Sequence, residues 1–216
     1  MANALERLVI GDDPDAWRAA GFTVHGTLMR FGKVEVDLVG SRGPRGVLAW
    51  KLRHVDTDID GLTTASEQDA ALVSRPENAP SVDEHTNAVF GIDHVVIQTG
   101  DVDRTVSAFA ALGIDERRST ISDTGAGQRR QSFLWAGRVI LEVIGPVHDT
   151  TASAASIWGL AMVSSNLQTT CHVFEENLST PRDAVQPGRK IATVRTDDLD
   201  ISVPLAILSP HVAELL

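Results

Sequence analysis

Two side chains capable of acid–base chemistry lie in otherwise apolar segments of the sequence. His94 lies in DHVVIQT, and Glu142 lies in VILEVIG. A histidine in such a segment is a metal ligand, a general acid–base group, or a buried ring hydrogen-bonded to a neighbour. A carboxylate among apolar residues is costly to bury without a partner, and His94 is the natural partner of Glu142. We therefore take His94 and Glu142 as the candidate catalytic pair.

Four further residues are candidates for binding a ligand. Gln186 and Arg189 flank a Pro-Gly turn ahead of a predicted strand, and Arg130 comes just before the strand-like segment QSFLWAG. An arginine in such a place can clamp a carboxylate or phosphate of a ligand, and the alternative is a solvated residue or a surface salt bridge. Trp158, like Trp135, can stack on a planar ligand, and the alternative is packing in the core.

A competing motif suggests calcium. Residues 56–67 read DTDIDGLTTASE, which matches the spacing of an EF-hand loop at Asp56, Asp58, Asp60, Gly61 and Glu67. The segment before it reads as a strand instead of a helix, and Thr63 stands where an apolar residue is expected. An Asp-rich turn after a strand is therefore the alternative interpretation.

The composition is that of an ordinary globular chain, with 216 residues of which 43% are hydrophobic and 22% charged. The net charge of −10 argues against nucleic acids, which need a basic face, and against anionic membranes. The single cysteine excludes an internal disulfide framework. No apolar run approaches the roughly 20 residues of a membrane span, and no secretory signal opens the sequence. We expect a cytoplasmic protein with a small-molecule ligand and no nucleic-acid or membrane partner.

The elements that position these side chains recur along the chain. Residues 91–146 read as a strand, a helix capped by Asp101, and three more strands. Residues 156–210 repeat this order with Asn166 as the cap, an offset of 166 − 101 = 65, and residues 5–55 are a weaker copy. We expect three regions: an N-terminal β-α-β-β-β-like unit over 1–61, a linker over 62–90, and a domain of two such units over 91–210.

Repeated units of this order resemble the vicinal oxygen chelate superfamily, which includes glyoxalase I, ring-cleaving dioxygenases, epimerases and antibiotic-resistance proteins. The resemblance rests on IDHVVIQTGDVDRTVSAFAALGI and RVILEVIGP in the second unit, and on WGLAMVSSNLQTT, RDAVQPGRKIATVR and VPLAILSP in the third. It implies an α+β fold in which two units close into a cupped mixed sheet around a ligand cleft.

The resemblance also implies where a metal would be held, because ligands come from the first and last strands of each paired unit. His94 and Glu142 match these positions in the second unit. Gly159 and Ala206 stand at the corresponding positions of the third unit, and neither can ligate through its side chain. We therefore expect no cofactor in the cup, and a divalent metal on His94 and Glu142 is the alternative.

Three functions are open at this point. The first is a glyoxalase-like small-molecule-binding protein or enzyme that works without a metal, with His94 as acid–base group and Glu142 orienting it. The second is a metal-dependent lyase, isomerase or dioxygenase of the same superfamily. The third is a non-catalytic protein that sequesters a drug or metabolite. Because the first unit is left unpaired and an exposed apolar sheet is usually covered, we also expect a homodimer.

Overall fold

The computed structural model describes residues 3–66, 84–125, 127–148 and 150–211. The elements in this part of the chain are, in order, β1 (Leu5–Ile10), α1 (Pro14–Ala19), β2 (Leu28–Phe31), β3 (Val34–Leu38), β4 (Val47–Leu52), β5 (Val89–Gln98), α3 (Val102–Ala110), β6 (Glu116–Thr124), β7 (Gly127–Ala136), β8 (Val139–Pro146), β9 (Ser156–Ser164), α4 (Leu167–Phe174), η1 (Glu175–Asn177), β10 (Arg182–Asp183), β11 (Lys190–Thr193), η2 (Asp197–Leu199) and β12 (Leu205–Leu208). None of the helices described here is long and apolar enough to cross a membrane.

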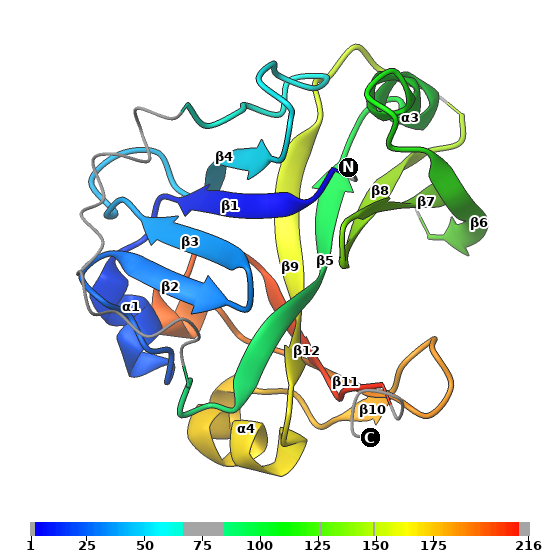
Figure 1. Cartoon of the computed structure of the whole chain (residues 1–216). Helices are drawn as coiled ribbons and strands as arrows, with labels where there is room; N and C mark the ends of the chain where they lie inside the picture. The colour runs from blue at the N-terminus through cyan, green and yellow to red at the C-terminus, as the bar shows by residue number, and fades with distance from the viewer. Residues whose placement is uncertain (1–2, 67–83, 126, 149, 212–216) are drawn as a thin grey trace.

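The larger sheet has eight strands in the order β10-β11-β12-β9-β5-β8-β7-β6. In each half the first strand pairs in parallel with the last, β5 with β8 and β9 with β12, and the two first strands pair antiparallel at the centre. Figure 1 shows β6–β8 and β10–β12 extending from this centre toward the same side of the molecule. The predicted α+β fold, with two repeated units forming one cupped mixed sheet, is therefore confirmed.

Both predicted helix caps are present in this sheet's crossovers. Asp101 Oδ1 accepts a hydrogen bond of 3.0 Å from the backbone N–H of Arg104. Asn166 Oδ1 accepts hydrogen bonds of 3.1 Å from the backbone N–H groups of Gln168 and Thr169. These bonds satisfy N–H groups that have no partner inside a helix, so each side chain marks where its helix begins.

The four-stranded sheet, in the order β2-β3-β1-β4, differs from the expected N-terminal unit. The parallel partner of β1 is β3, whereas β4 pairs antiparallel with the other side of β1, in the place that β9 takes beside β5. Trp50 of β4 forms a parallel bridge with Thr64. Thr64 therefore holds the place beside β4 that β12 holds beside β9, because β12 also pairs in parallel with β9. This part of the chain thus combines one unit with the rudiment of another. Strand periodicity identifies a strand but not its neighbours, so the sequence did not predict this pairing.

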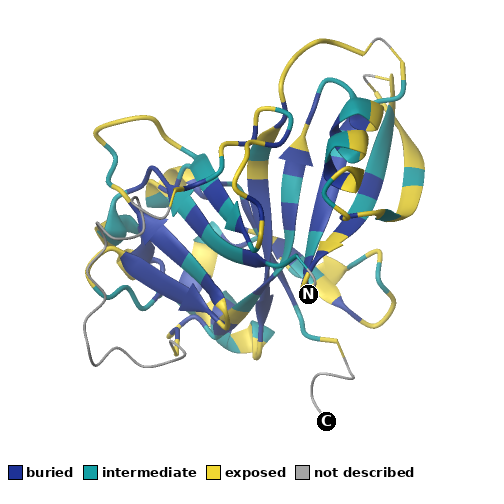
Figure 2. Cartoon of the chain, turned by 45° about the horizontal axis from the view of Figure 1, so that its top comes forward, coloured by how far each residue is buried: buried dark blue, intermediate teal, exposed yellow. Residues whose placement is uncertain are grey.

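The two sheets share one hydrophobic core. Figure 1 shows the four-stranded sheet beside β5 and β9, on the side away from β6–β8 and β10–β12, and Figure 2 shows that the strands in the middle are mostly buried. Several side chains on the inner face of the small sheet are at most 1% exposed, among them Leu8, Ile10, Met29, Val36, Leu38 and Trp50. The first unit is therefore covered within its own chain, and the exposed apolar sheet that motivated the predicted homodimer is not seen in the described residues.

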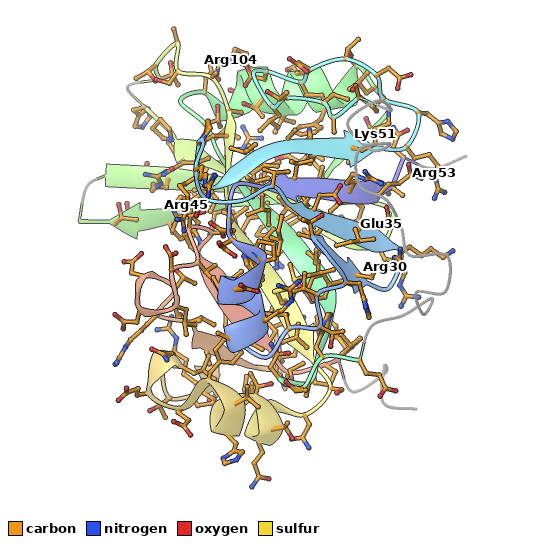
Figure 3. The ribbon with its side chains drawn as sticks, turned by 90° about the vertical axis from the view of Figure 1, so that its left-hand side faces the viewer. Arg30, Glu35, Arg45, Lys51, Arg53 and Arg104 are labelled. Carbon is orange, nitrogen blue, oxygen red and sulfur yellow. The ribbon has the colours of Figure 1, made fainter. Side chains whose placement is uncertain are left out.

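A buried carboxylate joins the N-terminal sheet to the C-terminal unit. Asp12, which is 0% exposed, accepts hydrogen bonds from Trp17 Nε1 at 3.1 Å and from Ser202 Oγ at 2.6 Å. Arg45 Nε lies 3.0 Å from Asp12, and its Nη2 lies 3.0 Å from the exposed Asp200. Figure 3 shows Arg45 at the end of the small sheet where β4 begins. Removing Asp12 would leave the buried indole N–H of Trp17 and the partly buried donors of Ser202 without this acceptor.

We expect Asp12→Ala to lower the free energy of unfolding by about 3 kcal/mol, because the change leaves the buried indole N–H of Trp17 without an acceptor and removes the buried partner of Arg45 and Ser202. Urea denaturation followed by circular dichroism measures this loss. Asp200→Ala is the matched control, since Asp200 pairs with the same Arg45 at the surface, and we expect it to cost less than about 1 kcal/mol. Equal losses in the two variants would contradict the assigned role of Asp12.

Candidate functional site

His94 and Glu142 come from neighbouring parallel strands, β5 and β8, and lie on one face of the larger sheet, called the cup face below. Val96 stands opposite Glu142 in this pairing, and His94 points to the same side because it lies two residues before Val96. His94 Nε2 lies 3.2 Å from Glu142 Oε2, and the side chains are 20% and 11% exposed. The partnership that the sequence predicts is thus present in the structure, and it is partly accessible to solvent.

A β-bulge adds a third ionisable group. Ile92 stands opposite Met162 and His94 stands opposite Ala161, so Asp93 is an extra residue in β5. Asp93 Oδ2 lies 3.0 Å from His94 Nδ1. Neighbours in a regular strand point to opposite faces, which is why sequence reasoning missed Asp93, and a bulge re-aims a side chain. The one available signal was its position directly before His94.

Arg189 ties this cluster to the other half of the sheet. Its side chain is 1% exposed, and its Nη1 donates to Asp93 Oδ1 at 2.7 Å and also to Gln186 Oε1. Its Nε donates to the backbone oxygen of Ser209 at 2.7 Å. Nη2 is buried and has no hydrogen-bond partner in the part of the chain that the structure describes. The predicted ligand-binding residues Gln186 and Arg189 therefore lie beside the His94 cluster.

Gln131 of β7 orients Glu142 from the opposite side. Its Nε2 donates to Glu142 Oε1 at 3.0 Å, so both oxygens of this carboxylate have a donor. The amide oxygen of Gln131 in turn lies 3.3 Å from Thr120 Oγ1. Sequence reasoning missed Gln131 because nothing in the segment QRRQSFLWAG identifies which residue faces the strand that carries Glu142.

The charges in this cluster alternate along the chain of hydrogen bonds. Burial alone would lower the pKa of His94, but the hydrogen bonds and charges of Asp93 and Glu142 outweigh burial and raise this pKa to about 9. Burial would raise the pKa of Asp93, yet the hydrogen bonds from His94 and Arg189 hold it below its usual value. At neutral pH, His94 is therefore an imidazolium whose two N–H groups face carboxylates.

The residues present do not fit the four-ligand metal site that the resemblance implies. Val96 stands opposite Gly159, and Ala161 stands opposite Ala206, so Gly159 and Ala206 hold the positions equivalent to His94 and Glu142. A Cβ atom at Gly159 would lie 2.8 Å from the carbonyl oxygen of Pro204, which leaves no room for a larger side chain. Among the described residues, no group of three or more His, Cys, Asp or Glu side chains is arranged to hold a metal.

The other two predicted ligand-binding residues lie outside this cluster. Arg130 neighbours Gln131 in β7 and so faces the opposite side of the sheet, where it pairs with Asp103 and with Glu116 at 2.8 Å. Trp158 is 54% exposed at a bulge of β9. Its exposure leaves it available for stacking, and no hydrogen bond or ring contact joins it to His94 in the described part of the chain.

The acidic motif after β4 forms a hydrogen-bonded turn. Its first three carboxylates each have a separate partner: Asp56 with Lys51, Asp58 with the backbone N–H of Thr64, and Asp60 with Arg104. Figure 3 shows Lys51 and Arg104 on different elements. Glu67 lies outside the described residues. The three aspartates therefore do not converge on one point, and the alternative interpretation as an Asp-rich turn describes them better than a calcium loop.

The fold is similar to that of solved proteins, but the sequence is not. A xylose isomerase-like TIM barrel/4-hydroxyphenylpyruvate dioxygenase fusion protein matches 98% of this chain with a TM-score of 0.62 and 12% identity, and the chain spans 50% of that protein. Methylmalonyl-CoA epimerase from Mycobacterium tuberculosis matches 62% of this chain and 96% of its own, with a TM-score of 0.48 and 20% identity. No protein-family model and no curated protein sequence matches.

The similarity to the fusion protein defines the class of fold and not an activity. The chain has the fold of the vicinal oxygen chelate superfamily, as the resemblance of its repeated units implied. At 12% identity, the likeness says nothing about which reaction or ligand the cup face serves. The chemistry must therefore be argued from the residues around His94.

We expect His94 to stay protonated up to about pH 9, because two carboxylates stabilise its charged form. A titration of the imidazole followed by ¹H–¹⁵N NMR measures this pKa. Glu142→Gln removes one of the two charges, so its His94 should titrate at a lower pH. A native midpoint at the ordinary value of 6.5 would contradict the assignment.

The same shift makes stability depend on pH in a known direction. Since the folded pKa lies above 6.5, the stabilisation is complete below pH 6.5 and is lost as the pH rises through about 9. The free energy of unfolding of the wild type should therefore fall by up to about 3 kcal/mol over this window. His94→Gln, which cannot titrate, should not show that loss.

Proposed function

We propose that the cup face binds a small organic molecule and exchanges protons with it through His94 and Glu142, without a metal ion. The observation that carries this proposal is the partly exposed ion pair of an imidazolium and a carboxylate, 3.2 Å apart. An acid and a base held this close on one face can act on adjacent atoms of one ligand. Asp93, Arg189 and Gln131 keep the pair in position through hydrogen bonds.

The proposed exchange balances within the pair. His94 Nε2 donates its proton to a carbonyl oxygen of the ligand, while Glu142 takes a proton from the neighbouring carbon. The neutral imidazole and the protonated carboxyl then lie in hydrogen-bond reach, so the proton passes from Glu142 back to His94 and restores the starting state. This is the chemistry of a lyase or isomerase that works through an enol.

The surroundings suit a ligand with an apolar body. By strand register, Phe133 stands opposite Glu142, Ile140 stands opposite His94, and Val96 lies between the two sites, so all three face the cup. Each is only partly buried. Apolar walls around a few convergent polar groups are typical of small-molecule sites.

A second function, binding without chemistry, has one observation in its favour. Both ring nitrogens of His94 and both carboxylate oxygens of Glu142 already have partners, and the high pKa of His94 keeps its proton in place at neutral pH. Such a pair also suits a protein that only sequesters an oxygen-bearing drug or metabolite. The donor set around Gly159 and Ala206 gives no support to the metal-dependent alternative.

Deuterium exchange separates these functions. We expect the protein to accelerate exchange of the α-protons of 2-oxobutanoate or dihydroxyacetone in D₂O, followed by ¹H NMR. His94→Gln and Glu142→Gln should each slow this exchange by about 100-fold or more. Glu116→Gln, which removes a carboxylate paired with Arg130 on the other face, is the control and should change nothing.

Exchange that is equally fast in all variants would contradict the acid–base role. A ligand that raises the melting temperature of the wild type but not of His94→Gln, with no proton exchange, would favour the sequestering function. Metal content measured by elemental mass spectrometry completes the test. One equivalent of metal in the wild type that is lost in a variant carrying both His94→Ala and Glu142→Ala would favour the metal-dependent alternative.

We also propose the homodimer, now with different support. β6 forms the outer edge of the larger sheet, and most of its residues are exposed. An open edge strand offers unpaired backbone groups to a second chain. Light scattering should give twice the 23.2 kDa of one chain at micromolar concentration. A mass of 23.2 kDa would contradict the proposal.

A further inference from the structure

A pocket of about 540 Å³ opens at the end of the larger sheet, and its lining includes no member of the His94 cluster. It lies between the segment before β1, the turn from α3 into β6, and the turn from β7 into β8. Its lining includes Asn3, Gly113, Asp115, Arg117, Trp135 and Gly137, called the rim pocket below. None of these residues takes part in the hydrogen bonds of His94, Glu142, Asp93 or Arg189. The volume is in the range of small-molecule sites, roughly 300–1,000 Å³.

Trp135 gives the rim pocket a flat aromatic wall. Trp17 and Trp50 are 0% and 1% exposed, whereas Trp135 is 43% exposed. It alternates with Leu134 and Ala136, which face the core, so the sheet itself holds the indole outward. An exposed tryptophan in a concave site is a natural surface for stacking a planar group.

Arg117 supplies a positive charge that has no ion-pair partner among the residues that the structure describes. Glu116 stands opposite Leu134 and Arg118 stands opposite Phe133, so Arg117 is the extra residue of a β-bulge in β6. Arg117 lines the rim pocket, whereas its neighbour Arg118 does not. Neither arginine has an ion pair or side-chain hydrogen bond with any residue that the structure describes. The bulge therefore distinguishes two exposed, adjacent arginines by their direction.

We propose that the rim pocket binds a planar aromatic carboxylate, with the ring on Trp135 and the carboxylate on the guanidinium of Arg117. A guanidinium matches a carboxylate with two parallel hydrogen bonds. Asp115 lies in the same pocket and limits its net charge, so a single carboxylate fits better than a multiply charged anion. This site goes beyond the proton exchange proposed for the cup face and does not depend on it.

The test uses 2-naphthoate and its neutral counterpart 2-naphthalenemethanol as probes, with affinities measured by isothermal titration calorimetry. The wild type should prefer the carboxylate by at least tenfold. Arg117→Gln should remove this preference, whereas Arg118→Gln should keep it. Trp135→Leu should weaken both probes at least tenfold, whereas Trp158→Leu, which removes a similarly exposed tryptophan outside the pocket, should leave both unchanged. All four residues compared lie at exposed positions, and circular dichroism checks the fold of each variant.

Three results would overturn the proposal. The first is no binding of 2-naphthoate by the wild type at millimolar concentration. The second is an equal effect of Arg117→Gln and Arg118→Gln, which would indicate unspecific attraction. The third is loss of binding in His94→Gln with Arg117→Gln unaffected, which would place the probe on the cup face and not in the rim pocket.

Discussion

The antiparallel pairing of β5 with β9 is the constraint on which the rest of the structure depends. It joins the two repeated units, and each strand also pairs in parallel with the last strand of its own unit. Val96 therefore stands opposite Glu142 on one side and Gly159 on the other. One register thus brings His94 to Glu142 and sets a glycine where a second ligand would have to stand. The chemistry of the cup face follows from this register because Gly159 and Ala206 hold the places in the other half that His94 and Glu142 hold in this one.

A single unpaired charge would be costly to bury on the cup face. The charged side chains around His94 therefore alternate between negative and positive. Glu142, His94, Asp93 and Arg189 form a line of two negative and two positive groups joined by hydrogen bonds. Such a line adds little net stability, because desolvation offsets attraction, but removing one member leaves its neighbour uncompensated. Arg189 reaches from the third unit to Asp93 in the second. The site therefore also fastens the two halves of the sheet together.

Sequence periodicity and capping residues predicted the repeated units, the starts of α3 and α4, and the partnership of His94 with Glu142. These features depend on neighbouring residues, or they follow from a repeat that can be aligned within the sequence. Asp93 was missed because a bulge interrupts the alternation of side-chain direction along a strand. Gln131 was missed because the sequence of one strand does not determine which residues of another strand stand opposite it. The pairing of β4 with β1 was not predicted, for the same reason. What escaped prediction is thus the register, which depends on contacts between segments far apart in the sequence.

The four-stranded sheet shows that the fold alone does not determine the chemistry of the site, which depends on which residues stand at the paired positions. Val9 stands opposite Asp37 as Val96 stands opposite Glu142, and Arg7 Nη1 lies 2.9 Å from Asp37 Oδ2. The same strand pairing therefore carries a cation and a carboxylate in both sheets. Arginine does not release its proton in a protein, so this second pair can only be a fixed ion pair. Burial raises the pKa of Asp37 even beside Arg7, and the labelled Glu35 and Arg30 in Figure 3 extend the charges over the outer face. An imidazole at the equivalent place on the cup face can both hold and give up a proton, which is why we assign the acid–base chemistry to His94 and Glu142 and not to Arg7 and Asp37.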